Sequence, residues 1–151
     1  MTQVFFYHNA PERVQAACAL LVKSYEQGKA MTLFIPDTER AEFMDRILWT
    51  QPATGFLPHC PVDSPLAAET PILLAREAQS LLNPACAPRL FNLAEETSDE
   101  VIQIFARFAS LIEVIGLDAQ ERERARKRVQ SYKAAGFSVG YKDLTKERKQ
   151  P

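Results

Sequence analysis

The fold is decided by residues 4–35, whose sequence is VFFYHNAPERVQAACALLVKSYEQGKAMTLFI. The short apolar run at residues 4–8 predicts a buried strand. Apolar residues then recur at three- and four-residue spacing, which predicts an amphipathic helix that starts near Pro11 and ends at Gly28. A second apolar run, residues 31–35, predicts another buried strand. The stretch is therefore expected to form a strand–helix–strand unit, which favours a parallel sheet.

The same alternation continues through the rest of the chain. The expected helices cover residues 38–49, 98–115 and 118–136, and the expected strands cover residues 71–75 and 89–93. Short apolar strands that alternate with amphipathic helices favour a mostly parallel sheet covered by helices on both faces. The predicted fold class is therefore α/β, with a three-layer α/β/α arrangement.

The composition is that of an ordinary globular protein, with 151 residues, 46% of them hydrophobic and 25% charged, and a formal net charge of −1. This length suits a single domain, which we expect to cover residues 1–140, followed by a charged, flexible tail at residues 141–151. Three scattered cysteines argue against a disulfide framework and favour a cytoplasmic location. Neither a signal-peptide pattern nor a membrane-spanning apolar run occurs, which fits the same expectation.

The sequence motifs of nucleotide and metal sites do not occur. The turn after the first expected strand has no glycine, and neither G-x-x-x-x-G-K-[ST] nor G-x-G-x-x-G is found. His8, His59, Cys60 and Cys86 do not follow the spacing of a zinc site. The adjacent His59 and Cys60 are compatible with a thiol nucleophile, but we favour packed loop residues. No catalytic residue, metal or cofactor is expected, and a nucleotide-dependent enzyme with degenerate motifs is the alternative.

The helix expected at residues 118–136 carries six Arg or Lys and three acidic residues, in a chain whose net charge is −1. At about 100° per residue, Arg122, Arg126, Val129 and Lys133 fall within a sector of about 60° beside an apolar seam. This arrangement fits an acidic peptide with a hydrophobic end. Two alternatives stay open, namely a solvated helix face with internal Glu–Arg pairs and direct DNA binding by the basic helix.

A second candidate surface is the segment LWTQPATGFLPH at residues 48–59. It combines the single Trp of the chain, Trp49, with Pro52, Phe56 and His59 directly after an expected helix. Large aromatic residues in a loop are frequent in protein–protein hot spots. The alternative is that the two aromatic residues cover one end of the core, and the residues alone do not decide between these interpretations.

Three stretches of the chain resemble the chi subunit family of bacterial DNA polymerase III holoenzyme, over essentially the whole length. They are the opening run Phe5-Phe6-Tyr7, the string W-x-x-P-x-x-x-F-x-P-H from Trp49, and the string R-x-x-x-x-x-Y-K-A-A-G-F from Arg126. The Trp–Pro–Phe–Pro–His string is the most specific of the three. The resemblance implies a Rossmann-like fold without a nucleotide site. It also implies a non-catalytic accessory subunit, with the nucleotidyltransferase activity in another subunit.

The resemblance further implies a psi subunit as partner, in a 1:1 heterodimer that links the chain to the clamp loader. In the family the psi contact involves the Trp/Phe loop. Here the loop maps to Trp49 and Phe56, with Pro52 and His59 as neighbours. The expected setting is the bacterial cytoplasm at the replication fork, with DNA contacted only indirectly.

The second partner that the resemblance implies is the C-terminal tail of single-stranded DNA-binding protein, which is acidic and ends in phenylalanine. Carried over residue by residue, the tail site comprises Arg122, Arg126 and the position of Val129. Helical geometry adds Lys133 to this set. Val129 stands where better-known members have an aromatic residue, so a ring against the phenylalanine of the tail is expected to be missing.

Overall fold

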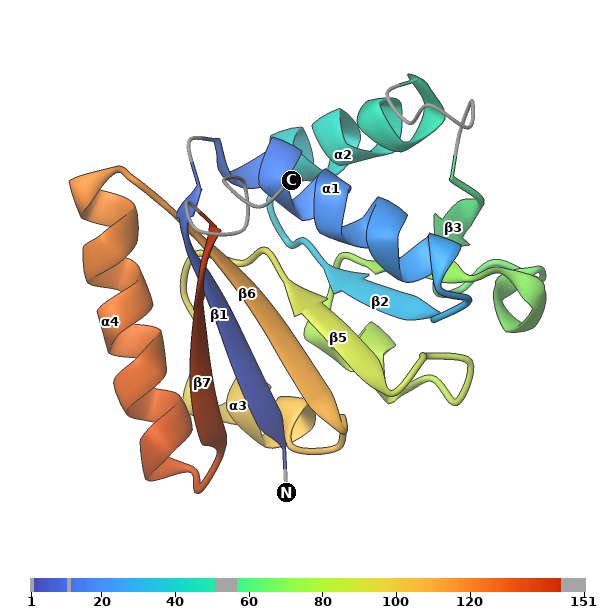
Figure 1. Cartoon of the computed structure of the whole chain (residues 1–151). Helices are drawn as coiled ribbons and strands as arrows, with labels where there is room; N and C mark the ends of the chain where they lie inside the picture. Colours follow the sequence, from blue (N-terminus) through green and yellow to red (C-terminus); the bar gives the residue numbers. More distant parts are fainter. Residues whose placement is uncertain (1, 11, 51–56, 145–151) are drawn as a thin grey trace.

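The computed structural model of the chain describes residues 2–10, 12–50 and 57–144 (Figure 1). Its strands are β1 (Gln3–Ala10), β2 (Met31–Phe34), β3 (His59–Pro61), β4 (Ile72–Ala75), β5 (Arg89–Asn92), β6 (Ser110–Gly116) and β7 (Ser138–Asp143). Its helices are α1 (Arg13–Glu26), α2 (Thr38–Thr50), α3 (Asp99–Phe105) and α4 (Ala119–Ala134), with two short 3₁₀ turns, η1 (Ala67–Glu69) and η2 (Ala78–Leu82).

Within the described residues, the strands form one seven-stranded sheet in the order β3-β4-β2-β5-β6-β1-β7. Every neighbouring pair runs parallel, so each connection must cross over a face of the sheet. Strand β1 lies between β6 and β7, with Phe5 in register with Ile112 on one side and Gly140 on the other. The predicted α/β class with a parallel sheet is confirmed.

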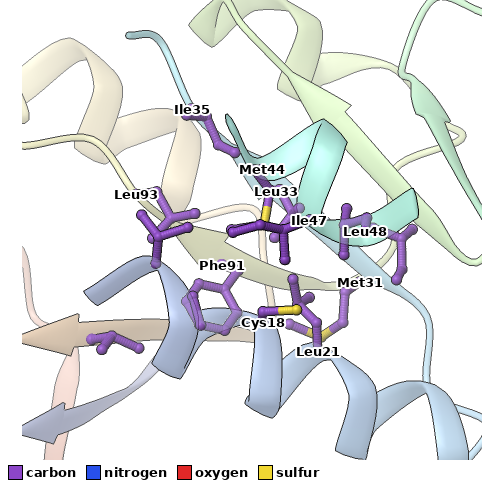
Figure 2. Close-up of a cluster of buried hydrophobic side chains, with 14 of the residues drawn as sticks. Cys18, Leu21, Met31, Leu33, Ile35, Met44, Ile47, Leu48, Phe91 and Leu93 are labelled. Atoms are coloured by element: carbon purple, nitrogen blue, oxygen red, sulfur yellow. The ribbon is translucent and has the colours of Figure 1, made fainter. Parts of the chain in front are cut away.

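Helices cover both faces of the sheet and give it two separate cores. Helices α1 and α2 lie together on one face (Figure 1), where Figure 2 shows Cys18 of α1 and Met44 of α2 packed near Phe91 of β5. On the other face, Phe6 of β1 and Tyr132 of α4 belong to a second cluster of buried side chains under α3 and α4. The three-layer arrangement expected from the sequence is therefore present.

The single helix predicted for residues 98–115 is wrong. Helix α3 ends at Phe105, and Ser110–Gly116 forms β6 in the interior of the sheet. A strand buried on both faces is apolar at almost every position, so its residues also satisfy a helical spacing. Adjacent residues of β6 point into opposite cores. Ile112 packs under α1, and Leu111 packs under α3 and α4.

The two edge strands were also missed. His59 and Cys60, expected in a loop, belong to β3, which pairs with β4. At the opposite edge, β7 pairs with β1 along its whole length, and Leu144 beyond it is buried. The expected boundary of the tail at residue 141 therefore falls inside a strand. The rest of that tail, residues 145–151, lies outside the described residues.

Helix α4 has the limits that the sequence predicts. The Asp118 carboxylate accepts a hydrogen bond of 3.1 Å from the backbone N–H of Glu121, which caps the start of the helix. At the other end, Gly136 adopts a φ of 88°, the left-handed conformation that terminates many helices. The helix is thus held at both ends by local signals.

Candidate functional site

A buried polar network fixes the rotation of α4 against the sheet. Glu113 in the middle of β6 is fully buried and accepts a hydrogen bond of 3.0 Å from Arg128 Nε. The Tyr132 hydroxyl and the Asn92 amide also donate to its carboxylate, at 2.5 and 3.2 Å. Arg128 further donates to the backbone carbonyl of Glu95 at 2.7 Å. One of the six cations of the helix is therefore an internal partner of the sheet and does not belong to its outer surface.

At neutral pH, Tyr132 and Arg128 have the protonation states that this network needs. Burial raises the pKa of Tyr132 well above its usual value of 10, and the Glu113 carboxylate adds to the rise. Burial alone would lower the pKa of Arg128, but the charge of Glu113 and its hydrogen bond bring the net shift above the usual value. Tyr132 therefore stays a neutral donor and Arg128 a cation, so both keep facing the same carboxylate.

Because Arg128 and Tyr132 point inward, the neighbouring face of α4 borders an open groove of about 560 Å³. All four residues predicted from the helical spacing line it: Arg122, Arg126, Val129 and Lys133. The remaining lining residues are His8 and Asn9 of β1, Ile115 of β6, Ala125 and Gln130 of α4, and Tyr141 of β7. The groove thus lies between α4 and the β1–β7 edge of the sheet, and we call it the α4/β7 groove.

The charge of the α4/β7 groove has one sign. Arg122, Arg126 and Lys133 contribute three cations, and none of the described residues that line it carries a carboxylate side chain. Arg122 donates to the Asn9 side-chain oxygen at 3.2 Å, a neutral acceptor that leaves its charge uncompensated. Arg126 lies 3.5 Å from the Glu123 carboxylate, but both side chains are more than half exposed, and such pairs are weak. The groove therefore presents a positive surface to an anionic ligand.

The apolar part of the groove includes a ring that the sequence did not predict. Tyr141 is 55% exposed, and its ring stacks on Phe6 with a centroid separation of 6.0 Å and an interplanar angle of 29°. Val129 and Ile115 belong to the partly buried residues packed on the core below. Tyr141 lies in the segment expected to be a flexible tail, although Val139 and Tyr141 follow the two-residue period of a strand.

A second exposed aromatic feature lies at the β3 edge of the sheet. Trp49 at the end of α2 is 53% exposed, and its ring makes an edge contact with His59 at a centroid distance of 5.4 Å. The His59 ring nitrogens lie 2.6 Å from the Leu57 carbonyl oxygen and 2.7 Å from an Asp45 carboxylate oxygen. The side chain of His59 is only 3% exposed, so the Trp49 ring packs against a buried side chain. We call this feature the Trp49/His59 surface.

The crevice at the carboxyl ends of the strands, where nucleotides bind in many α/β proteins, is filled by protein side chains. Arg13, Glu95, Arg124 and Arg128 border it together with Val114, and it has no room for a water molecule. Arg13 Nε donates to the Val114 carbonyl at 3.0 Å, and burial lowers the pKa of Arg13 to about 10. In the described part of the chain, no group of three or more His, Cys, Asp or Glu could hold a metal ion.

A family model described as "DNA polymerase III chi subunit, HolC" matches residues 1–140. The chain belongs to the DNA polymerase III chi subunit family. Two relatives named DNA polymerase III subunit chi are similar to it. The one from Escherichia coli (strain K12) is 22% identical over 125 residues, covering 83% of this chain and 81% of the relative. The one from Pseudomonas aeruginosa (strain PAO1) is 28% identical over 145 residues, covering 92% and 94%.

The chi-family chain also shares its fold with a solved structure of different origin. The C-terminal domain of Dbp5 from S. cerevisiae, solved bound to Gle1 and IP6, aligns with a TM-score of 0.59 and covers 93% of this chain and 90% of that chain. The sequence identity is 9%, so the likeness concerns the fold alone. Membership in the chi family places the chain among subunits of DNA polymerase III and hence in DNA replication.

The structure brings together most of the residues that the sequence of this chi-family chain singled out. The four residues expected at the tail site share the α4/β7 groove, and Trp49 and His59 are in contact. Pro52 and Phe56, expected beside them, lie outside the described residues. No helix in the described ranges is both long and apolar enough for a membrane span.

Proposed function

We propose that this chi-family chain is a non-catalytic accessory subunit of the DNA polymerase III holoenzyme that binds the acidic tail of single-stranded DNA-binding protein in the α4/β7 groove. A psi subunit, bound at the Trp49/His59 surface, would connect the chain to the clamp loader. Its place would be the bacterial cytoplasm at the replication fork. The observation that carries this proposal is the convergence of three cations and an exposed aromatic ring in one groove, with no carboxylate among its lining residues in the described part of the chain.

The cations of the groove suit the charged part of such a tail. The terminal carboxylate and the aspartates pair with Arg122 and Arg126, whose guanidinium groups can each engage a carboxylate through two hydrogen bonds. Lys133 continues the positive row along the helix. Because these side chains are exposed, their attraction for the tail weakens as salt screens it. The affinity for one short peptide is expected to be in the micromolar range.

The apolar part of the groove suits the final phenylalanine of the tail. Its ring would lie over Val129, the position where better-known members of the family have an aromatic residue. Tyr141 from β7 borders the same groove and offers the ring that Val129 lacks. Its stacking on Phe6 holds it in place, so binding would order little additional side chain.

The test is a fluorescence anisotropy titration with a labelled peptide that carries several aspartates and ends in Phe with a free carboxylate. We expect Arg126→Ala to weaken binding by up to about fivefold, because an exposed charge contact is worth at most about 1 kcal/mol. Lys127→Ala is the matched control, since Lys127 is exposed on the same helix but does not line the groove. If the wild type and Arg126→Ala bind the peptide with equal affinity, the α4/β7 groove is not the tail site.

The Trp49/His59 surface has the chemistry of a docking site for a protein helix or loop. Trp49 offers a large exposed ring, and His59 in contact with it is fixed by two polar contacts, so the ring starts from a defined position. Large preorganised aromatic side chains contribute strongly to binding hot spots. The other two positions expected at the psi contact, Pro52 and Phe56, lie outside the described residues.

Co-expression with a psi subunit tests this second contact. Trp49→Ala should abolish co-purification of untagged psi with the tagged chain, whereas Leu66→Ala, which truncates a different exposed apolar side chain, should leave it unchanged. Psi recovered in equal amounts with the wild type and Trp49→Ala would contradict the proposed contact.

A further inference from the structure

A second cationic cavity lies on the opposite face of the sheet from the α4/β7 groove. It has a volume of about 270 Å³ and lies between the C-terminal half of α1 and the strands β6, β1 and β7. Phe5 and Tyr7 of β1 line it, whereas Phe6 between them points to the core under α4. Neither the chi-family expectations nor the proposed function uses this cavity.

Four positive side chains converge on this cavity from four parts of the chain. Lys23 belongs to α1, Lys29 follows α1, Arg89 starts β5 and Lys142 belongs to β7. No carboxylate side chain lines the cavity, and none of the four cations forms an ion pair within the described residues. In a chain of net charge −1, this local excess of four positive charges costs electrostatic free energy unless an anion compensates it.

The guanidinium group of Arg89 contains a buried hydrogen-bond donor, Nη1, without an acceptor among the described residues. A buried donor without a partner is unfavourable, and more so when it is charged. An anion seated beside the guanidinium group would neutralise its charge and accept from its remaining N–H groups.

The walls of the cavity favour a small phosphorylated ligand. The Lys142 ammonium group lies 5.7 Å from the centre of the Tyr7 ring, so both form one wall. Ser24 and Gln27 add neutral polar side chains that can bond to phosphate oxygens. The volume is many times the roughly 30 Å³ of a water molecule but lies below the range of about 300 to 1,000 Å³ of drug-sized ligand sites.

We propose that this cavity binds a phosphate-bearing anion through Lys23, Lys29, Arg89 and Lys142. The phosphate can belong to a small molecule or to the backbone of a nucleic-acid strand, because the recognised groups are the same in both cases. We expect a terminal phosphate to fit better than a continuous strand, because the cavity holds only about 270 Å³.

The experiment measures binding to the full-length chain by isothermal titration calorimetry in low-salt buffer without phosphate. One arm uses inorganic pyrophosphate and the other a single-stranded oligodeoxythymidine. We expect pyrophosphate to bind the wild type and to lose at least about tenfold in affinity with Arg89→Gln and with Lys142→Gln. Lys127→Gln, which removes an exposed cation that lines neither this cavity nor the α4/β7 groove, should bind pyrophosphate like the wild type.

The second arm identifies the source of the phosphate. Oligonucleotide binding that the same two substitutions abolish would assign the cavity to a phosphodiester backbone, while pyrophosphate binding alone would assign it to a small ligand. Lys142→Gln lies at an exposed position, so it remains informative if Arg89→Gln fails to fold. Absence of binding in both arms, or binding that neither substitution affects, would overturn the proposal.

Discussion

At the scale of single residues, position in the fold decides what each charged or aromatic side chain does. Arg126 and Arg128 are two residues apart on α4, yet Arg126 borders the open groove and Arg128 is buried against Glu113. Helical spacing alone predicted that Arg126 shares one face of α4 with Arg122, Val129 and Lys133, and this face lines the groove. The sequence did not distinguish Arg128 from the other cations, because nothing local indicates that a buried carboxylate from β6 lies opposite.

The contact between the Tyr141 ring and the terminal phenylalanine of the tail can be tested by substitution. If the Tyr141 ring forms the wall for the terminal phenylalanine, Tyr141→Ala should weaken binding of the acidic peptide by about fivefold, the equivalent of about 1 kcal/mol of aromatic contact. Tyr141→Phe keeps the ring and should bind like the wild type in the same anisotropy titration. A loss with Tyr141→Phe as large as that with Tyr141→Ala would assign the effect to the hydroxyl group instead.

The buried Tyr132 gives stability a specific dependence on pH. Its pKa is raised in the folded chain, so above pH 10 the unfolded chain releases a proton that the folded chain retains. The stabilisation is complete below pH 10 and falls as the pH rises further, with a slope of at most about 1.4 kcal/mol per pH unit. Urea denaturation between pH 8 and pH 11 should show this extra slope in the wild type.

Tyr132→Phe is the matched control for that measurement, because it removes only the titrating hydroxyl group. At pH 8 it should lower the free energy of unfolding by about 1 to 3 kcal/mol, since Glu113 loses a hydrogen bond in the core. The gap between the two proteins should then narrow above pH 10. Parallel curves over the whole pH range would contradict the role given to Tyr132.

At the scale of elements, α4 is the part of the chain that the sequence describes best. Its start near Asp118, its end at Gly136 and the sector of side chains that lines the α4/β7 groove were all expected from local patterns. The interior strand β6 could not be predicted, because two-sided burial removes the polar alternation that marks a strand. The edge strand β7 was missed for a different reason, since its polar and charged residues resemble those of a loose tail.

The cap of α4 supports a prediction about the element as a whole. Asp118→Ala removes the side chain that accepts from the Glu121 N–H, and it should lower the free energy of unfolding by about 0.5 to 2 kcal/mol. Asp118→Asn, which keeps a capping oxygen, should retain most of the stability. Urea denaturation followed by circular dichroism would show whether the two variants differ in this order.

At the scale of the whole molecule, the two proposed contact surfaces lie at opposite edges of the sheet. The α4/β7 groove borders β7, the last strand at one edge, and the Trp49/His59 surface borders β3 at the other (Figure 1). A chain that bridges two partners needs such a separation, because neither partner then obstructs the other. The sequence could not supply this arrangement, which depends on the order of the strands.

Because the two surfaces lie at opposite edges of the sheet, we expect the acidic peptide and psi to bind independently of each other. The affinity for the acidic peptide should change by less than about twofold when psi is bound, because sites without shared contacts are expected to act additively. Anisotropy titrations of the free chain and of the purified complex with psi would measure the difference. A much larger change would mean that the sheet couples its two edges.

Residue-resolved nuclear magnetic resonance can show whether the acidic tail binds in the α4/β7 groove. The ¹⁵N-labelled full-length chain is titrated with the unlabelled peptide that ends in phenylalanine. We expect amide shifts at Arg122, Arg126, Val129 and Lys133 and at Tyr141 across the groove, with none at Trp49. Shifts confined to the Trp49/His59 surface or to the cavity under α1, with α4 and β7 unaffected, would contradict binding of the tail in the α4/β7 groove.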